Sequence, residues 1–266
     1  MISKPSLYAL NLLERCGLDD PTEIPLHVIV LGLGAFYEER PLKKCEGRIV
    51  TFDNKTIITI NNNISIEGKK RYAIAHEIGH FEMHRDSIPI IIDSELNFVD
   101  WLKHGPHEQE ANEFAAEFLM PREIFKSECK EKKISPDLIR YLASRFQTSL
   151  TSTVLRYVQF GNHEVCVVYC KDNKMKWWKK SKDFFPFLNF EYDNPPPAGS
   201  VAYEMFTKKP FYDDREQKQQ IWKSDWFEMK DDEADLPFFE FCIFVPSYNY
   251  TLSIIWEENK KSKYSN

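Results

Sequence analysis

The stretch RYAIAHEIGHFEMH, residues 71–84, places three histidines four residues apart in a segment with the apolar spacing of a helix. Residues four apart on a helix share a face, with Cβ atoms about 5–6 Å apart, so the imidazoles of His76 and His80 can converge on one ion. Glu77 lies one position round the axis, within reach of a water molecule on that ion. We therefore predict a helix over residues 67–85 that carries a metal site.

The segment HEIGH matches the pattern HExxH, in which two neutral imidazoles bind zinc and the glutamate acts as a general base. Zinc lowers the pKa of a bound water to about 7, so Glu77 needs to accept only one proton to deliver hydroxide to a carbonyl. The pattern predicts hydrolysis of an amide bond, with His76 and His80 as zinc ligands and Glu77 as the catalytic base.

The other side of the predicted helix carries an apolar stripe formed by Ile74, Ile78 and Phe81. Such a stripe packs on a core and leaves the histidine face to present ligands, which favours a metal site over two surface histidines. His84 continues the four-residue spacing one turn further. Three histidines on one straight helix rarely reach a single tetrahedral ion, so we expect His84 to support a ligand or to lie at the surface.

A catalytic zinc ion takes a third protein ligand, and the segment HEQEANEFAAEFLMP, which starts at residue 107, offers one. On a helix over residues 107–119, Glu108 lies at the edge of the apolar stripe and is aligned with Asn112. An inward carboxylate requires a partner, which zinc would supply, and Asn112 is suited to orienting a ligand by a hydrogen bond.

The sequence around this second helix leaves alternatives open. His104 and His107 remain possible third ligands, because either could turn inward. The far side of the helix carries three glutamates that we expect to face solvent: Glu110, Glu113 and Glu117. Several residues near the motif could donate a hydrogen bond to the oxyanion of the reaction, and the sequence does not choose among them: Arg71, Tyr72, His104 and His107.

The pair AHEIGHFEMH and EQEANEFAAEFLMP resembles the ImmA/IrrE family of zinc metallopeptidases, which couples HExxH to a later glutamate in an E-x-x-A-N-x-F-A helix. The resemblance covers about residues 5–160. It implies zinc ligands at His76, His80 and Glu108, with Glu77 as the base. Members of the family cleave DNA-binding repressors. The resemblance therefore implies an endopeptidase whose protein substrate is a helix-turn-helix repressor on a separate chain, in a stress or mobile-element response.

The remaining pattern predicts an α+β protein with two domains. Helices are expected at 24–34, 121–131, 136–146 and 150–160, a hairpin at 47–61, and a loop at 86–106. After Gly161 the chain becomes rich in strand candidates and tryptophan, with a proline-rich break at DNPPPAGS. We therefore expect a mainly helical, zincin-like peptidase domain with a small β-sheet over residues 1–163. An antiparallel α+β domain would follow over residues 164–266, with a regulatory or substrate-recruiting role.

Composition limits the other functional classes. The net charge is −6 and the six cysteines are scattered without a CxxC pair, which suits a reducing compartment. With no signal peptide and no apolar run of membrane-spanning length, we expect a soluble, cytoplasmic protein that contacts no membrane. The sequence does not indicate the oligomeric state, the activating signal or the cleavage site.

Two rival functions remain. The segment LASRFQTSLTSTVLRY, residues 142–157, has the rhythm of a helix-turn-helix, but residues 136–160 carry three arginines against one aspartate, a net charge of +2. That charge is small for a recognition helix, so we expect no direct binding to nucleic acid. The other rival is a non-catalytic, zinc-stabilised regulator that binds a repressor or DNA. A purely structural zinc site has no need of a base such as Glu77.

Overall fold

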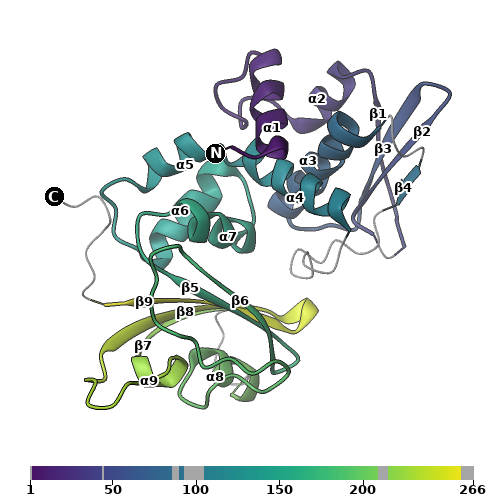
Figure 1. Ribbon diagram of the computed structural model, residues 1–266. Coiled ribbons are helices and arrows are strands. Elements are labelled where there is room, and N and C mark those ends of the chain that lie inside the picture. The colour runs from purple at the N-terminus through teal and green to yellow at the C-terminus, as the bar shows by residue number, and fades with distance from the viewer. Residues whose placement is uncertain (1, 44, 86–89, 93–104, 209–214, 259–266) are drawn as a thin grey trace. The chain divides into compact units, whose positions relative to one another are not determined.

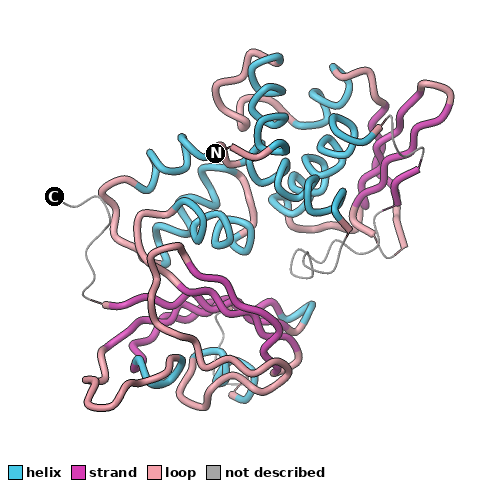
Figure 2. Tube along the Cα trace, viewed as in Figure 1, coloured by secondary structure: helices cyan, strands magenta, loops and turns pink. Residues whose placement is uncertain are grey.

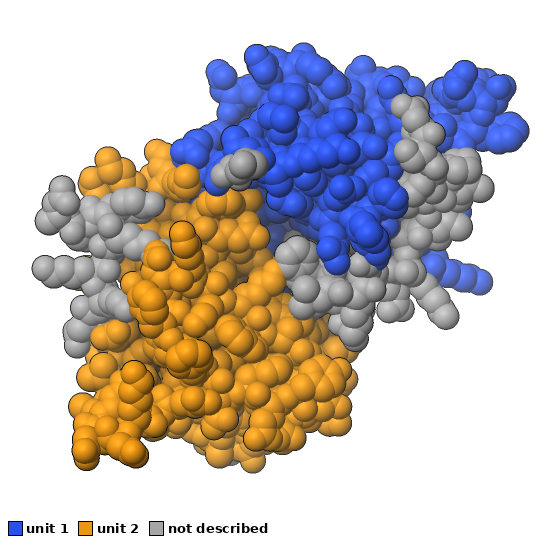
Figure 3. Space-filling view, in the orientation of Figure 1, with its two compact units in different colours: residues 1–125, 140–153 blue, residues 126–139, 154–266 orange. Residues whose placement is uncertain are grey.

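The computed structural model describes residues 2–43, 45–85, 90–92, 105–208 and 215–258. The chain divides into two compact units (Figure 3), one made of residues 1–125 and 140–153 and the other of residues 126–139 and 154–266. The fold is α+β, as predicted, and each unit has its own β-sheet (Figure 2). Among the described helices, none is both long enough and apolar enough to cross a membrane.

The helices of the first unit before residue 120 are α1 (Lys4–Arg15), α2 (Leu26–Gly32), α3 (Glu67–His84) and α4 (Pro106–Leu119) (Figure 1). Helix α3 packs against α4, α1, α2 and two strands. Every residue of α3 from Arg71 to Phe81 is buried. The expected apolar stripe is therefore present, but the histidine face opposite it is covered as well, because α4 packs there.

The first sheet has the strand order β1-β3-β2-β4, with β1 (Phe36–Arg40) parallel to β3 (Lys55–Asn61). Strand β2 (Gly47–Phe52) pairs antiparallel with both β3 and β4 (Ile90–Ile92). The predicted hairpin is thus β2 and β3, and its two turn residues, Asp53 and Asn54, have φ angles of 49° and 58°. Asparagine and aspartate tolerate this left-handed conformation, which a two-residue hairpin turn requires.

Two strands of this sheet were not predicted. Strand β1 has the sequence FYEER, in which two glutamates and an arginine replace the β-branched and apolar residues that indicate a strand. Strand β4 falls inside the segment expected to be a loop, so that prediction was wrong at residues 90–92. The rest of that loop before Gly105 lies outside the described residues.

One of the glutamates expected to face solvent does not. Glu117 is 1% exposed, and its carboxylate accepts a hydrogen bond of 2.9 Å from the backbone N–H of Arg122. That N–H belongs to the first residue of helix α5 (Arg122–Cys129), where backbone donors have no partner within the helix. Glu117 therefore caps the next helix, whereas Glu113 is exposed as predicted.

Helices α5, α6 (Pro136–Phe146) and α7 (Leu150–Phe160) lie within two residues of their predicted bounds, and each contributes residues to both units. The domain boundary at residue 163 stays a prediction. Arg156 of α7 is 3% exposed and its guanidinium lies 4.3 Å from the centre of the Phe160 ring. This placement does not favour a helix-turn-helix that contacts phosphates through Arg156.

The second unit contains an antiparallel sheet with the order β6-β5-β9-β8-β7. Its strands are β5 (Cys166–Lys171), β6 (Lys174–Lys180), β7 (Glu216–Trp222), β8 (Pro237–Val245) and β9 (Tyr250–Glu257). The second unit also contains the short helices α8 (Val201–Thr207) and α9 (Lys223–Trp226). Side chains from this sheet and both helices form one apolar core, centred on residues such as Val168, Met205 and Trp226.

A carboxylate lies inside this second core. Glu240 of β8 is fully buried and accepts four hydrogen bonds of 2.6–3.0 Å. The donors are the backbone N–H groups of Val201 and Ala202 at the start of α8, the indole of Trp226 and the hydroxyl of Ser253. Burial raises the pKa of Glu240, and these four donors oppose that shift. The carboxylate thereby ties α8, α9 and β9 to β8.

We predict that Glu240→Gln destabilises the second unit by about 1–3 kcal/mol, because the amide nitrogen of glutamine would face donors that now meet an oxygen. Urea unfolding followed by tryptophan fluorescence measures the loss, since five of the six tryptophans lie after residue 163. The exposed Glu228→Gln is the control and should unfold as the wild type does. Equal unfolding midpoints for all three proteins would contradict the prediction.

Candidate metal centre

Helix α3 approaches α4 closely at Gly79. A Cβ atom built on Gly79 would lie 3.0 Å from Cδ1 of Phe114, which is tighter than ordinary carbon contacts. Glycine therefore lets the α4 backbone come near α3, and the histidines of one helix then face the first turns of the other. His76, Glu77 and His80 are all fully buried in this arrangement.

Three side chains converge between the two helices. Nε2 of His76 lies 3.0 Å from Nε2 of His80 and 3.1 Å from Oε2 of Glu108, while Nε2 of His80 lies 3.3 Å from Oε1 of Glu108. Ligand atoms on one tetrahedral zinc ion are about 3.3 Å apart, given bond lengths of about 2.0–2.1 Å. These three side chains could therefore hold a metal ion.

Asn112 orients the first of these imidazoles, as the sequence suggested. Its Oδ1 lies 3.0 Å from Nδ1 of His76 and also accepts a hydrogen bond of 2.8 Å from the hydroxyl of Tyr72. An amide oxygen can only accept, so Nδ1 of His76 carries the hydrogen and Nε2 presents its lone pair. The hydroxyl of Tyr72, one of the predicted candidates for the oxyanion donor, is engaged with Asn112. The sequence could have indicated the contact between Tyr72 and Asn112, because Tyr72 lies four residues before His76 and so shares its face of the helix.

A parallel chain of contacts orients the second imidazole. Nε2 of His84 lies 2.8 Å from Oε2 of Glu110, and Nδ1 of His84 lies 3.2 Å from Nδ1 of His80. The carboxylate holds the hydrogen on Nε2 of His84, so Nδ1 of neutral His84 accepts from Nδ1 of His80. Burial lowers the pKa of His84, which favours this neutral form. Nε2 of His80 is thus left with a lone pair, and His84 acts in support rather than as a third ligand.

Glu110 is partly exposed to solvent, as expected, but it also contacts His84, and the sequence did not predict that contact. Its side chain is 37% exposed.

The electrostatics of the three converging groups suit a cation. Burial opposes ionisation of Glu108, but its contacts with His76 and His80 outweigh that effect and hold its pKa well below the usual range. These contacts lower the pKa only while an imidazole supplies a proton; when both imidazoles are neutral, their Nε2 lone pairs point at each other and at the carboxylate. Such an arrangement of acceptors is repulsive unless a cation or a proton lies between them, so the donor set fits a divalent metal.

The predicted base, Glu77, lies beside strand β2. A Cβ atom built on Gly47 would lie 2.3 Å from Oε1 of Glu77, closer than real Cβ atoms come to any atom. Gly47 therefore provides the space that the carboxylate occupies. Sequence reasoning missed this contact, because nothing in the strand GRIVTF shows which residue of α3 its first position will meet.

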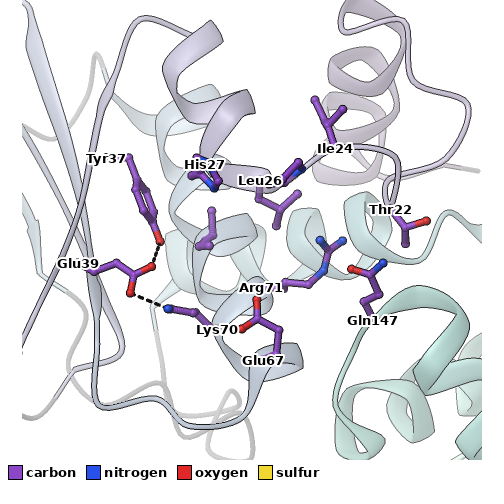
Figure 4. A pocket seen from close by; sticks show the side chains of 12 residues that line it. Thr22, Ile24, Leu26, His27, Tyr37, Glu39, Glu67, Lys70, Arg71 and Gln147 are labelled. Carbon is purple, nitrogen blue, oxygen red and sulfur yellow. Dashed lines mark hydrogen bonds and ion pairs between the residues drawn. The ribbon is translucent and has the colours of Figure 1, made fainter.

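Arg71, another candidate oxyanion donor, lies about 140° round the helix axis from His76, at 100° per residue. It is 6% exposed, and its Nη2 donates a hydrogen bond of 3.1 Å to the carbonyl of Pro21. Arg71 lines a separate pocket of about 280 Å³ (Figure 4), in which Glu39 accepts hydrogen bonds from Tyr37 and Lys70. Arg71 therefore belongs to this pocket and not to the converging ligands.

The alternative third ligands are not brought to the same point among the described residues. His107 has a side chain that is 51% exposed and lies near Glu110 and His84, whereas His104 lies outside the described residues.

Of three comparisons with known proteins, two found a similar family or structure. A search of curated proteins found no match. Among solved structures, a Mycobacterium tuberculosis transcriptional regulator is similar with a TM-score of 0.63 and 14% sequence identity, over 95% of this chain and 75% of that chain. At this identity the likeness shows a shared fold. The model of a peptidase family, described as the IrrE N-terminal-like domain, matches residues 32–157, which include α3 and α4. Residues 32–157 of this chain are therefore similar to the IrrE N-terminal-like domain family.

Proposed function

We propose that this protein is a zinc-dependent endopeptidase that hydrolyses a peptide bond in a DNA-binding transcriptional repressor. The observation that carries the proposal is the convergence of two buried imidazole nitrogens and one carboxylate within 3.0–3.3 Å, with Glu77 on the same helix. The match of residues 32–157 to the model of a peptidase family supports the same function.

His76, His80 and Glu108 would hold the zinc ion, and zinc, when bound, supplies Lewis acidity that makes water a better nucleophile near neutral pH. The chain supplies the rest. Asn112 and His84 keep a hydrogen on the Nδ1 atom of each imidazole, so that both Nε2 atoms remain available. Glu77 accepts a proton from the attacking water as general base and passes it to the leaving nitrogen.

The substrate class rests on the family. The resemblance to ImmA/IrrE peptidases, whose members cleave repressors, suggests a helix-turn-helix repressor on another chain. The solved structure that shares the fold is described as a transcriptional regulator. We place the chemistry in the region 1–163, since every proposed ligand and the base lie in α3 and α4. The region 164–266 would then regulate the peptidase or recruit its substrate.

A different reading keeps zinc but removes turnover: the protein would sequester a repressor without cutting it. The presence of Glu77 next to His76 in the sequence disfavours this reading, because a binding protein does not require a base there. The following three predictions test the third zinc ligand, the general base and the placement of that base.

We predict that Glu108→Ala lowers zinc affinity by at least about 100-fold, because loss of an outer partner alone costs 10–100-fold and a ligand should cost more. Zinc content after dialysis against a chelator measures the effect. Glu113→Ala, on the exposed side of the same helix, is the matched control and should bind zinc normally. Unchanged affinity in Glu108→Ala, with loss in Glu110→Ala or His104→Ala instead, would mean that the third ligand was misassigned.

We predict that Glu77→Gln keeps its fold and its zinc but cleaves the substrate about 10²–10⁴-fold more slowly, because it lacks the base. Cleavage is measured with purified repressors encoded beside this gene, and zinc content is measured on the same samples. A mutant that cuts as fast as the wild type would remove Glu77 from the mechanism. If the wild type cuts none of them while binding one tightly, the sequestering role would replace the peptidase.

We predict that Gly47→Ala slows cleavage by about 10²-fold, because the new methyl group must displace the Glu77 carboxylate and misplacement by about 1 Å has such an effect. The loss should fall on kcat, with zinc content unchanged. Gly32→Ala is the control, since a Cβ atom there meets nothing within 4 Å. Equal kcat values for Gly47→Ala and wild type would show that this contact does not position the base.

A further inference from the structure

A second group of side chains that could hold a metal ion lies one helical turn beyond the proposed zinc ligands. It consists of His84 at the end of α3 and His107 and Glu110 in the first turns of α4, and their ligand atoms lie within 4.8 Å of one another. The rings of His84 and His107 meet edge to face, with centres 4.4 Å apart. The donor set of two imidazoles and one carboxylate is the same as that of the proposed zinc site.

The spacing suits an ion. Oε2 of Glu110 lies 2.8 Å from Nε2 of His84 and 3.6 Å from Nδ1 of His107, values that bracket the separation of about 3.3 Å between ligand atoms on a tetrahedral zinc ion. The group is accessible from solvent, with side chains 51% exposed at His107 and 37% at Glu110. His84 is 4% exposed and anchors the group.

Imidazole donors favour zinc and similar divalent transition metals over magnesium and calcium, which prefer oxygen ligands. We propose that His84, His107 and Glu110 form a second, weaker binding site for Zn²⁺, and that an ion in this site opposes binding at His76, His80 and Glu108. The second part rests on the proposed function, because it concerns regulation of that zinc site.

Binding at one site opposes binding at the other because of the hydrogens on the imidazole rings of His80 and His84. Nδ1 of His80 and Nδ1 of His84 are 3.2 Å apart, and one hydrogen lies between them when only His80 binds a metal. If both rings bind metal through Nε2, each neutral ring must keep its own hydrogen on Nδ1. Two N–H groups would then face each other, so their contact must open before both sites are filled.

The experiment counts ions on the full chain. Metal-free protein is titrated with Zn²⁺ against a chromophoric chelator, and stoichiometry is checked by equilibrium dialysis. We expect two ions per wild-type chain, the second bound at least about tenfold more weakly. His107→Ala should bind one ion with the affinity of the wild-type first site. The control His27→Ala removes an exposed imidazole elsewhere and should still bind two.

Two results would overturn the second site: one ion in the wild type, or two ions in His107→Ala. His107 is half-exposed, so this variant should fold, and its circular dichroism spectrum checks that it does.

The opposition between the sites is tested with Glu108→Ala, which removes the first site and keeps His80 and His84. Because coupling is reciprocal, its remaining ion should bind about five-fold or more tightly than the second ion of the wild type. Equal affinities would overturn the coupling while leaving the second site in place.

These outcomes differ from failure of the proposed function. Ion counts do not depend on whether the chain cleaves a substrate. If Glu108→Ala binds two ions as the wild type does, the proposed zinc site is wrong, whereas loss of an ion in His107→Ala supports the second site in either case.

Discussion

Two imidazole nitrogens face each other across 3.0 Å in the interior of the first unit, and the arrangement around them depends on that contact. Both atoms present lone pairs, because Asn112 and His84 occupy the other nitrogen of each ring. Two acceptors so close together are unfavourable in a low-dielectric interior unless a cation joins them. The hydrogen bonds that hold them in place would therefore prepare the site for a metal ion, at a cost in stability that the surrounding packing of α3 must offset.

Two glycines make this arrangement possible. Gly79 lets Phe114 of α4 pack against α3, and Gly47 leaves room for Glu77 beside β2. Both act by lacking a side chain, so their importance lies in contacts between elements that are distant in sequence. The ligands and the base are thus positioned from three elements, although HExxH itself lies on one helix.

The local patterns predicted much of the fold. Helix periodicity located α3, α4, α6 and α7, and a strand pair joined by Asp-Asn predicted the β2–β3 hairpin, since these signals come from neighbouring residues. Strand β1 was missed because its partner, β3, lies some twenty residues later and the strand itself is charged.

Among the site residues, Glu108 and Asn112 were found from the stripe of α4, because burial of a polar group demands a partner. The partners of Glu110 and Glu117 were not predicted, for the converse reason. A helical pattern shows which residues share one face of a helix. It does not show whether the end of another helix packs against that face. His84 and the backbone of Arg122 supply partners that only the folded chain reveals.

The proposed ligands are separated along the chain, with His80 on α3 and Glu108 on α4, so an ion held by both closes a loop of 27 intervening residues. A ligand that binds only the folded state stabilises it by about 2.7 kcal/mol when its free concentration is 100 times its dissociation constant. A zinc ion at this place would act as a cross-link between the two helices as well as a reagent. The lifetime of the folded first unit, and hence the amount of protein that survives proteolysis in the cell, would then follow the supply of free zinc.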